Sequence, residues 1–162
     1  MAEFKHILVP TDFGESSRAA LEVAVELVNK YGATLTLLHA CENPLHSYPG
    51  MAYAPAEVLS ATEEHAQKEC DAAVKALRAR VPEARGVLRF GPPAHEIQKV
   101  IDETQVDLVV RGTHGRRGLG HVLLGSVAEK TVRLSPVPVL TVRGSKTASH
   151  DVIFSPKEQY IF

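Results

Sequence analysis

Five short apolar runs, separated by longer amphipathic stretches, set the pattern of this sequence. The runs are rich in Val, Leu and Ile and hardly alternate with polar residues: His6–Val9, Thr34–His39, Val87–Phe90, Val106–Val110 and Val137–Val142. Strands of a parallel sheet show this composition because helices cover both faces of the sheet. The runs therefore predict five buried strands.

Helical patterns fill the intervals between these runs. Apolar residues recur at helical spacing in Ser17–Tyr31, Pro55–Arg80, Pro93–Thr104 and Ser126–Leu134. Regular alternation of strands and helices favours a parallel sheet with right-handed crossovers. We therefore predict an α/β fold, an open sheet of five parallel strands with helices on both faces. Its ligand site is expected at the carboxyl ends of the strands, where strand order reverses.

Two segments fall outside this pattern. Cys41–Ala54 contains Pro44, Pro49 and Gly50 and is predicted to be a loop. Residues 144–162 begin with a polar stretch after the last strand and end with scattered apolar side chains. We expect one domain over residues 1–143 and a C-terminal tail over 144–162, which is either mobile or docks on its own or a partner subunit.

Net charge, the length of apolar runs and the spacing of cysteines indicate which partners and which cellular compartment to expect. The formal net charge of −1 gives no general attraction to nucleic acid or to an anionic membrane. No apolar run is long enough to cross a membrane, and the amino terminus lacks an apolar signal segment, so the cytoplasm is the expected location. Cys41 and Cys70 lack metal-ligand or CxxC spacing and are predicted to be free thiols. His39 ends a buried strand and is predicted to be a hydrogen-bonded core histidine.

A glycine-rich segment joins the fourth strand to the last helix. Five glycines fall between Gly112 and Gly125. Glycines allow backbone N–H groups to approach an anion closely, and the helix that starts at Ser126 adds N–H donors and the positive end of its dipole. Arg116 offers charge-assisted hydrogen bonds. Neither GxxxxGK[ST] nor GxGxxG is present. The residues alone thus predict an anion site, with a plain flexible turn as the alternative.

The spacing of these glycines carries a resemblance to a known family. Gly112-x2-Gly115-x9-Gly125-Ser126 resembles the ATP-binding signature of the universal stress protein family. Further segments resemble the family from residue 3 to residue 143: His6–Asp12, Leu37–Ala40, Gly91–Ile97, Leu124–Lys130 and Pro136–Leu140. The resemblance implies a Rossmann-like α/β/α sandwich, usually a homodimer, in the branch that binds ATP.

The resemblance also implies roles for individual residues. Asp12 corresponds to a carboxylate that hydrogen-bonds the ribose, Pro10 and Thr11 line the adenosine, and Ala40 contacts the adenine through its backbone. The implied phosphate cradle consists of Gly112, Gly115, Gly125, Ser126 and Val127. A second role stays open for Asp12, because aspartate side chains in turns commonly hydrogen-bond nearby backbone groups and so stabilise the turn itself.

Two side chains, those of Ser126 and Arg111, bear on how the implied site would hold phosphates. The hydroxyl of Ser126 can reach a phosphate or a phosphate-bound Mg²⁺, so ATP with Mg²⁺ is the expected ligand. Arg111 departs from the family pattern, because that position is commonly apolar. Its charge would either reach the phosphates or crowd the base.

The last strand suggests how copies associate. Pro136 and Pro138 stand at its start, as is typical of an edge strand, and an exposed apolar edge requires cover. We therefore expect a homodimer through Val137–Val142.

Three functions remain open on the sequence alone. They are an ATP-binding regulatory module of the stress response with a regulatory protein partner, a dimeric interaction protein with a vestigial site, and a slow ATPase or nucleotidyl transferase. No GxSxG elbow or positioned base is evident, so no catalytic residue is assigned and a dedicated enzyme is not expected.

Overall fold

The computed structural model describes residues 4–42, 55–114, 124–144 and 152–154. In chain order its elements are β1 (His6–Thr11), α1 (Glu15–Tyr31), β2 (Thr34–Cys41), α3 (Ala56–Leu77), β3 (Arg85–Phe90), α4 (Pro93–Thr104), β4 (Leu108–Gly112), α5 (Ser126–Leu134), β5 (Val139–Val142) and β6 (Val152–Phe154). The predicted alternation of strands and helices is confirmed.

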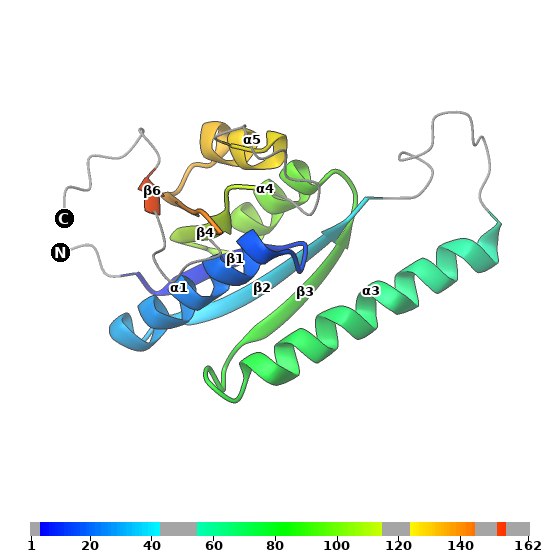
Figure 1. The fold of residues 1–162 in the computed structure, drawn as a ribbon, viewed down its shortest axis with the longest axis horizontal. Coiled ribbons are helices and arrows are strands. Elements are labelled where there is room, and N and C mark those ends of the chain that lie inside the picture. The colour runs from blue at the N-terminus through cyan, green and yellow to red at the C-terminus, as the bar shows by residue number, and fades with distance from the viewer. Residues whose placement is uncertain (1–3, 43–54, 115–123, 145–151, 155–162) are drawn as a thin grey trace.

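The strands form one sheet in the order β3-β2-β1-β4-β5-β6 (Figure 1). The first five strands are parallel, as predicted, and β6 is antiparallel to β5. The chain builds outward from β1 to β3, then returns to the other side of β1 with β4. Strand order therefore reverses between β1 and β4, and their carboxyl ends meet at one edge of the sheet.

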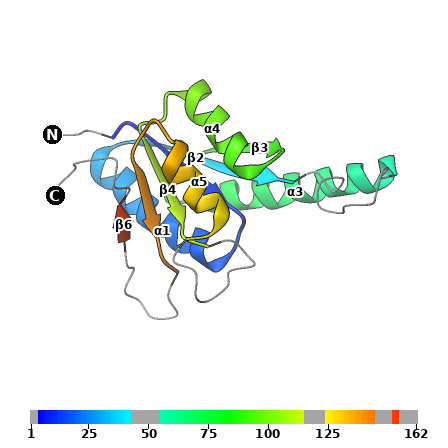
Figure 2. The ribbon, with the colours of Figure 1, turned by 90° about the horizontal axis from the view of Figure 1, so that it is seen from above.

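The apolar side chains of the strands divide between two layers of helices. Ile7, Leu37 and Val110 belong to a core shared with α1 and α3. Leu8 and Val109 belong to a second core shared with α4 and α5. Both faces are thus covered, which explains why the strands show little alternation in sequence. Figures 1 and 2 show these layers and the amino-terminal part of α3 extending beyond the sheet.

Some helix and strand boundaries agree with the sequence pattern and others differ by a few residues. The bounds of α4 and α5 agree with the sequence pattern, whereas β4 begins at Leu108 rather than Val106. Gln105 ends α4 in a left-handed conformation (φ 51°). The Asp107 carboxylate then accepts the backbone N–H groups of Lys5 (2.7 Å) and His6 (3.1 Å). These bonds fix the start of β1 beside the start of β4.

The C-terminal segment contributes a strand that the sequence pattern did not predict. β6 pairs with β5 in the register Leu140↔Phe154 and Val142↔Val152. This pairing favours docking on its own chain for this part of the tail. It also occupies the outer edge of β5, the edge at which we expected a second copy. A homodimer through β5 therefore requires β6 to leave that edge or to exchange between subunits.

Removing residues 145–162 should expose the β5 edge and strengthen self-association. We expect the chain 1–144 to dimerise roughly tenfold more tightly than the full chain, because an unpaired edge strand is a template for pairing. Light scattering over a concentration series measures this. Ile153→Pro, which breaks β6 without shortening the chain, should behave like the truncation. Equal dimerisation of all three proteins would contradict the prediction.

Candidate functional site

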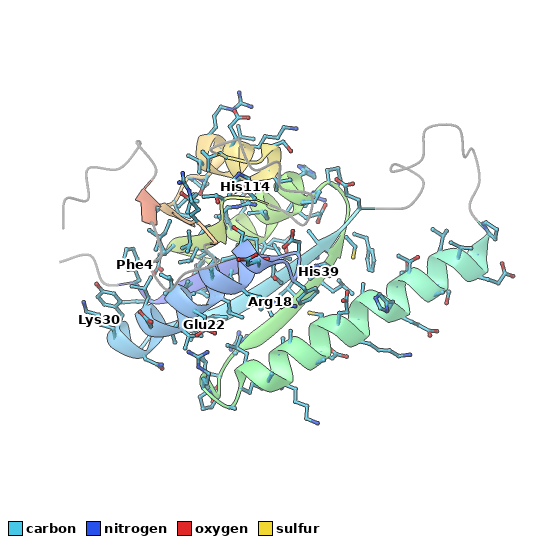
Figure 3. The ribbon with its side chains drawn as sticks, viewed as in Figure 1. Phe4, Arg18, Glu22, Lys30, His39 and His114 are labelled. Atoms are coloured by element: carbon cyan, nitrogen blue, oxygen red, sulfur yellow. The ribbon has the colours of Figure 1, made fainter. Side chains whose placement is uncertain are left out.

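The reversal of strand order brings the predicted site residues together. β1 ends at Thr11 and β4 ends at Gly112, and the two strands pair directly. Ligands of open α/β sheets bind at such a point, outside the carboxyl ends of the strands. Asp12 follows β1 and Thr113 follows β4, so both lie at this edge. Figure 3 labels His114, just after β4, and His39, near the end of β2.

Asp12 shapes the turn between β1 and α1. Its Oδ1 accepts the backbone N–H of Gly14 (2.9 Å) and the hydroxyl of Ser17. Phe13, between them, has a left-handed backbone with φ 61°, which is uncommon for a bulky residue. The turn role of Asp12 is therefore confirmed, and its contact with a ribose stays a prediction.

Gly112, the first glycine of the signature, lies against the first turn of α1. A Cβ atom here would meet the Ser16 hydroxyl and would stand 2.6 Å from the Ser16 carbonyl carbon and 2.8 Å from its oxygen. Only glycine permits this approach without a shift of α1 or β4. Close packing of helix on strand is thus one reason for glycine at this position. Its role in a phosphate cradle stays a prediction.

The amino terminus of α5 is tied to the end of β4. Gly125 donates its N–H to the Thr113 carbonyl (2.7 Å), and Thr113 donates to Val142 in β5 (3.0 Å). No side chain caps α5 within the described residues. Among the described residues, the first N–H groups of this helix, at Ser126 and Val127, therefore have no capping side chain, as an anion site needs. Gly115 and Arg116 lie outside the described residues.

Arg111 is a buried cation at this edge, with 8% of its surface exposed. Its Nη1 donates to Thr131 Oγ1 in α5 (2.8 Å) and its Nε donates to the Gly112 carbonyl (3.1 Å). Burial lowers the pKa of Arg111 to about 10, and the charge of Asp12 acts in the opposite direction. The structure therefore holds a desolvated positive charge beneath α5.

The end of β2 completes the edge. Ala40 is half-buried next to His39, whose register partner in β1 is Thr11. His39 is buried and its Nδ1 lies 2.9 Å from the Thr11 carbonyl oxygen. The prediction of a hydrogen-bonded core histidine is confirmed. β2 thus places the backbone of Ala40 on the same edge as Thr11.

Sequence reasoning missed the part that α1 plays in this edge. Ser16 contacts Gly112, donates its hydroxyl to the Val142 carbonyl (3.3 Å) and accepts the N–H of His114 (3.4 Å). Ser17 holds Asp12. Two small polar residues in the first turn of a helix were the available signal, since side chains there commonly bond nearby backbone groups.

Other candidate features lie elsewhere or are absent from the described residues. A hollow of about 410 Å³ opens between α3 and β3, lined by residues that include Cys70, Asp71 and Gly86. Its walls belong to α3 and β3, and β2 separates β3 from β1, so the hollow does not coincide with the β1–β4 ends that hold Asp12. In the ranges with described coordinates, no group of three metal-ligating side chains occurs, and no helix is long and apolar enough to cross a membrane.

Comparisons with known proteins agree with this arrangement. The family model described as "Universal stress protein family" matches residues 3–143. Universal stress protein YxiE of Bacillus subtilis is 33% identical over 86% of this chain and 99% of its own length. The structure of universal stress protein UspA from Lactobacillus plantarum superposes with a TM-score of 0.75 at 25% identity, covering 87% of this chain and 99% of that one.

A third comparison concerns a ligand complex. A universal stress protein solved in complex with cAMP has a TM-score of 0.63 at 22% identity, and the match covers 89% of this chain and all of that one. At this level of identity the likeness shows a shared fold.

Gly112→Ala should destabilise the fold by about 2 kcal/mol, because an added methyl group in a tight contact forces backbone shifts. Adding Ser16→Ala to Gly112→Ala should not restore the lost stability, since the added methyl group would also clash with the Ser16 backbone at 2.6 Å and 2.8 Å. Urea unfolding of the single and double variants tests both statements. A Gly112→Ala protein as stable as the parent would contradict the packing account.

Arg111→Met should raise the free energy of unfolding by about 1–2 kcal/mol. Burial lowers the pKa of Arg111 from its ordinary value to about 10 in the folded state, so its charge opposes folding below pH 10 and the opposition fades above it. The shift corresponds to about 3 kcal/mol, and the two lost hydrogen bonds offset part of that gain.

Urea unfolding at pH 7 measures this effect. Arg133→Met is the matched control on α5, because Arg133 has 62% of its side chain exposed, and it should change stability by less than about 0.5 kcal/mol. A destabilised Arg111→Met protein would contradict the assignment of Arg111 as an electrostatic cost.

Proposed function

The chain belongs to the universal stress protein family, and we propose that it binds an adenine nucleotide, ATP with Mg²⁺, at the carboxyl edge of β1 and β4. On this proposal the protein is a cytoplasmic regulatory module whose output depends on the bound nucleotide. The observation that carries the proposal is the convergence of Asp12, the start of α5, which no described side chain caps, and the buried cation of Arg111 at one edge of the sheet.

Each part of the edge suits a different part of the ligand. The turn at Asp12 presents a carboxylate for the ribose hydroxyls, and the backbone of Ala40 presents hydrogen-bonding groups to the adenine. The N–H groups of Ser126 and Val127, with the dipole of α5, suit the phosphates. The solved relative in complex with cAMP supports an adenine nucleotide as the ligand class.

Arg111 adds a fixed charge to this site. A desolvated cation gains more from a nearby anion than a solvated one does, because the local dielectric is low. Phosphates bound at the start of α5 would therefore compensate a charge that the unliganded protein holds at a cost. We assign Arg111 to phosphate attraction through charge, with its geometry set by Thr131 and Gly112.

A short path links the nucleotide edge to the outer strands. The N–H of Gly125 donates to the carbonyl of Thr113, and the N–H of Thr113 donates to the carbonyl of Val142 in β5, which pairs with β6. A ligand that favours one position of α5 would thereby favour one arrangement of the β5 edge. Regulation requires such a difference in affinity between two states. We propose that nucleotide binding biases the exchange between β6 and a second copy of the chain on β5.

Calorimetry with ATP and Mg²⁺ tests the nucleotide site. We expect one molecule bound per chain. Gly125→Val should weaken ATP binding at least tenfold and leave adenosine binding unchanged, because a side chain at the start of α5 blocks the phosphates. Gly125 has φ −69° and ψ 159°, which valine also adopts, so the fold should persist.

Asp12→Asn provides the complementary test. Asparagine keeps the Oδ1 acceptor for Gly14 and Ser17 but loses the charge, so ATP and adenosine should weaken together, by roughly tenfold. Asp102→Asn, an exposed aspartate of α4 bonded to Gln98, is the matched control and should bind like the parent. No binding by the parent would leave the dimeric interaction protein as the function. Product formation lost in Gly125→Val would establish the slow ATPase.

A further inference from the structure

A cysteine and a histidine face each other at the end of β2. The Sγ atom of Cys41 lies 3.1 Å from Nε2 of His39. The same imidazole has its Nδ1 2.9 Å from the backbone carbonyl oxygen of Thr11. Nothing in the nucleotide site uses this pair, since only the backbone of Ala40, between the two residues, is assigned there.

The hydrogen bond to Thr11 determines which ring nitrogen of His39 carries the hydrogen. It therefore also determines whether His39 accepts a proton from Cys41 or donates one to it. A carbonyl oxygen only accepts, so Nδ1 of His39 carries a hydrogen and donates it to Thr11. In the neutral imidazole Nε2 then has a free lone pair, and this lone pair faces the thiol of Cys41. His39 is thus placed to take the thiol proton, which makes the sulfur a nucleophile.

The imidazole is held in this orientation from a second side. The ring of Phe13 packs on the ring of His39 with 4.6 Å between centroids and an interplanar angle of 47°. His39 is buried, whereas Cys41 is partly exposed. A nucleophile, a base and a group that orients the base are therefore present together, and the residue that carries the nucleophile is partly exposed.

The second cysteine of the chain provides a contrast. Cys70 in α3 is buried and has no imidazole within hydrogen-bonding distance among the described contacts. Burial raises the pKa of Cys70, and the charges of Asp71 and Cys41 act in the same direction. Among the described groups of α3, Cys70 thus interacts electrostatically with Cys41. It should remain a protonated, unreactive thiol at neutral pH.

We propose that Cys41 is a nucleophilic modification site, activated by His39, that takes small-molecule disulfides. The Cys41 sulfur, after transfer of its proton to His39, attacks one sulfur of the disulfide. A new S–S bond forms to Cys41 as the old S–S bond breaks, and the leaving thiolate takes the proton from His39. Cys41 is oxidised and the leaving thiol is the reduced product, so electrons and protons balance.

Reaction of the full chain with the aromatic disulfide 5,5′-dithiobis(2-nitrobenzoic acid) tests the proposal, followed by the coloured thiolate that it releases. At pH 7, Cys70→Ser should react as fast as the parent, and Cys41→Ser should lose the fast phase. Adding His39→Gln to Cys70→Ser should slow the reaction roughly tenfold at pH 7. This difference should close at pH 10, where solvent alone removes the thiol proton.

Three results would overturn the proposal. They are a fast phase that survives in Cys41→Ser, equal rates at pH 7 with and without His39, and a rate deficit of His39→Gln that persists at pH 10, which would assign His39 a role in shape alone. Circular dichroism checks the fold of each variant. If His39→Gln does not fold, the pH–rate profile of Cys70→Ser decides: a midpoint well below the value of about 8.5 for a free thiol supports activation, and a midpoint at or above it does not.

Discussion

The close approach of α1 to β4 at Gly112 is the contact on which this edge of the molecule depends. It allows the Ser16 hydroxyl to contact both Val142 and His114. It also keeps the Asp12 turn, which leads into α1, beside the end of β4. Through Thr113 the same strand end holds Gly125 and so fixes where α5 begins. The site is therefore a product of packing and backbone hydrogen bonds, and any ligand there uses groups that the fold has already positioned.

The arrangement of sheet and helices could be predicted from the sequence more readily than the contacts between individual side chains. Runs such as Thr34–His39 were identifiable because strands buried on both faces need apolar residues throughout, and the parallel sheet followed from their alternation with helices. Three-residue β6 has too little periodicity to be distinguished from a tail. The glycine signature marked Gly112, but spacing cannot separate a glycine needed for helix packing from one needed for phosphates. The direction of Arg111, beneath α5 towards Thr131, depends on side-chain packing that only the structure provides.

The edge combines groups that cost stability with groups that suit a ligand. Arg111 is desolvated, Phe13 has a left-handed backbone, and no side chain in the described part of the chain caps the first N–H groups of α5. Departures of this kind gather at functional sites, where local structure is retained for reasons other than stability. The His39–Cys41 pair lies on the same edge and offers different chemistry, because a base beside a thiol suits covalent modification whereas helix N–H groups suit a bound anion. One sheet edge thus presents two kinds of chemistry, one on the β1–β4 side and one on β2.

The central claim is that an adenine nucleotide binds where strand order reverses, and amide chemical shifts test its location most directly. Titration of the ¹⁵N-labelled protein with ATP and Mg²⁺ should produce its largest shifts at Gly14, Thr113, Gly125 and Ser126, with small shifts along α3. The largest shifts around Cys70 and Gly86 would place the ligand in the hollow between α3 and β3, and contradict the account. An unchanged spectrum at saturating ATP would contradict it as well.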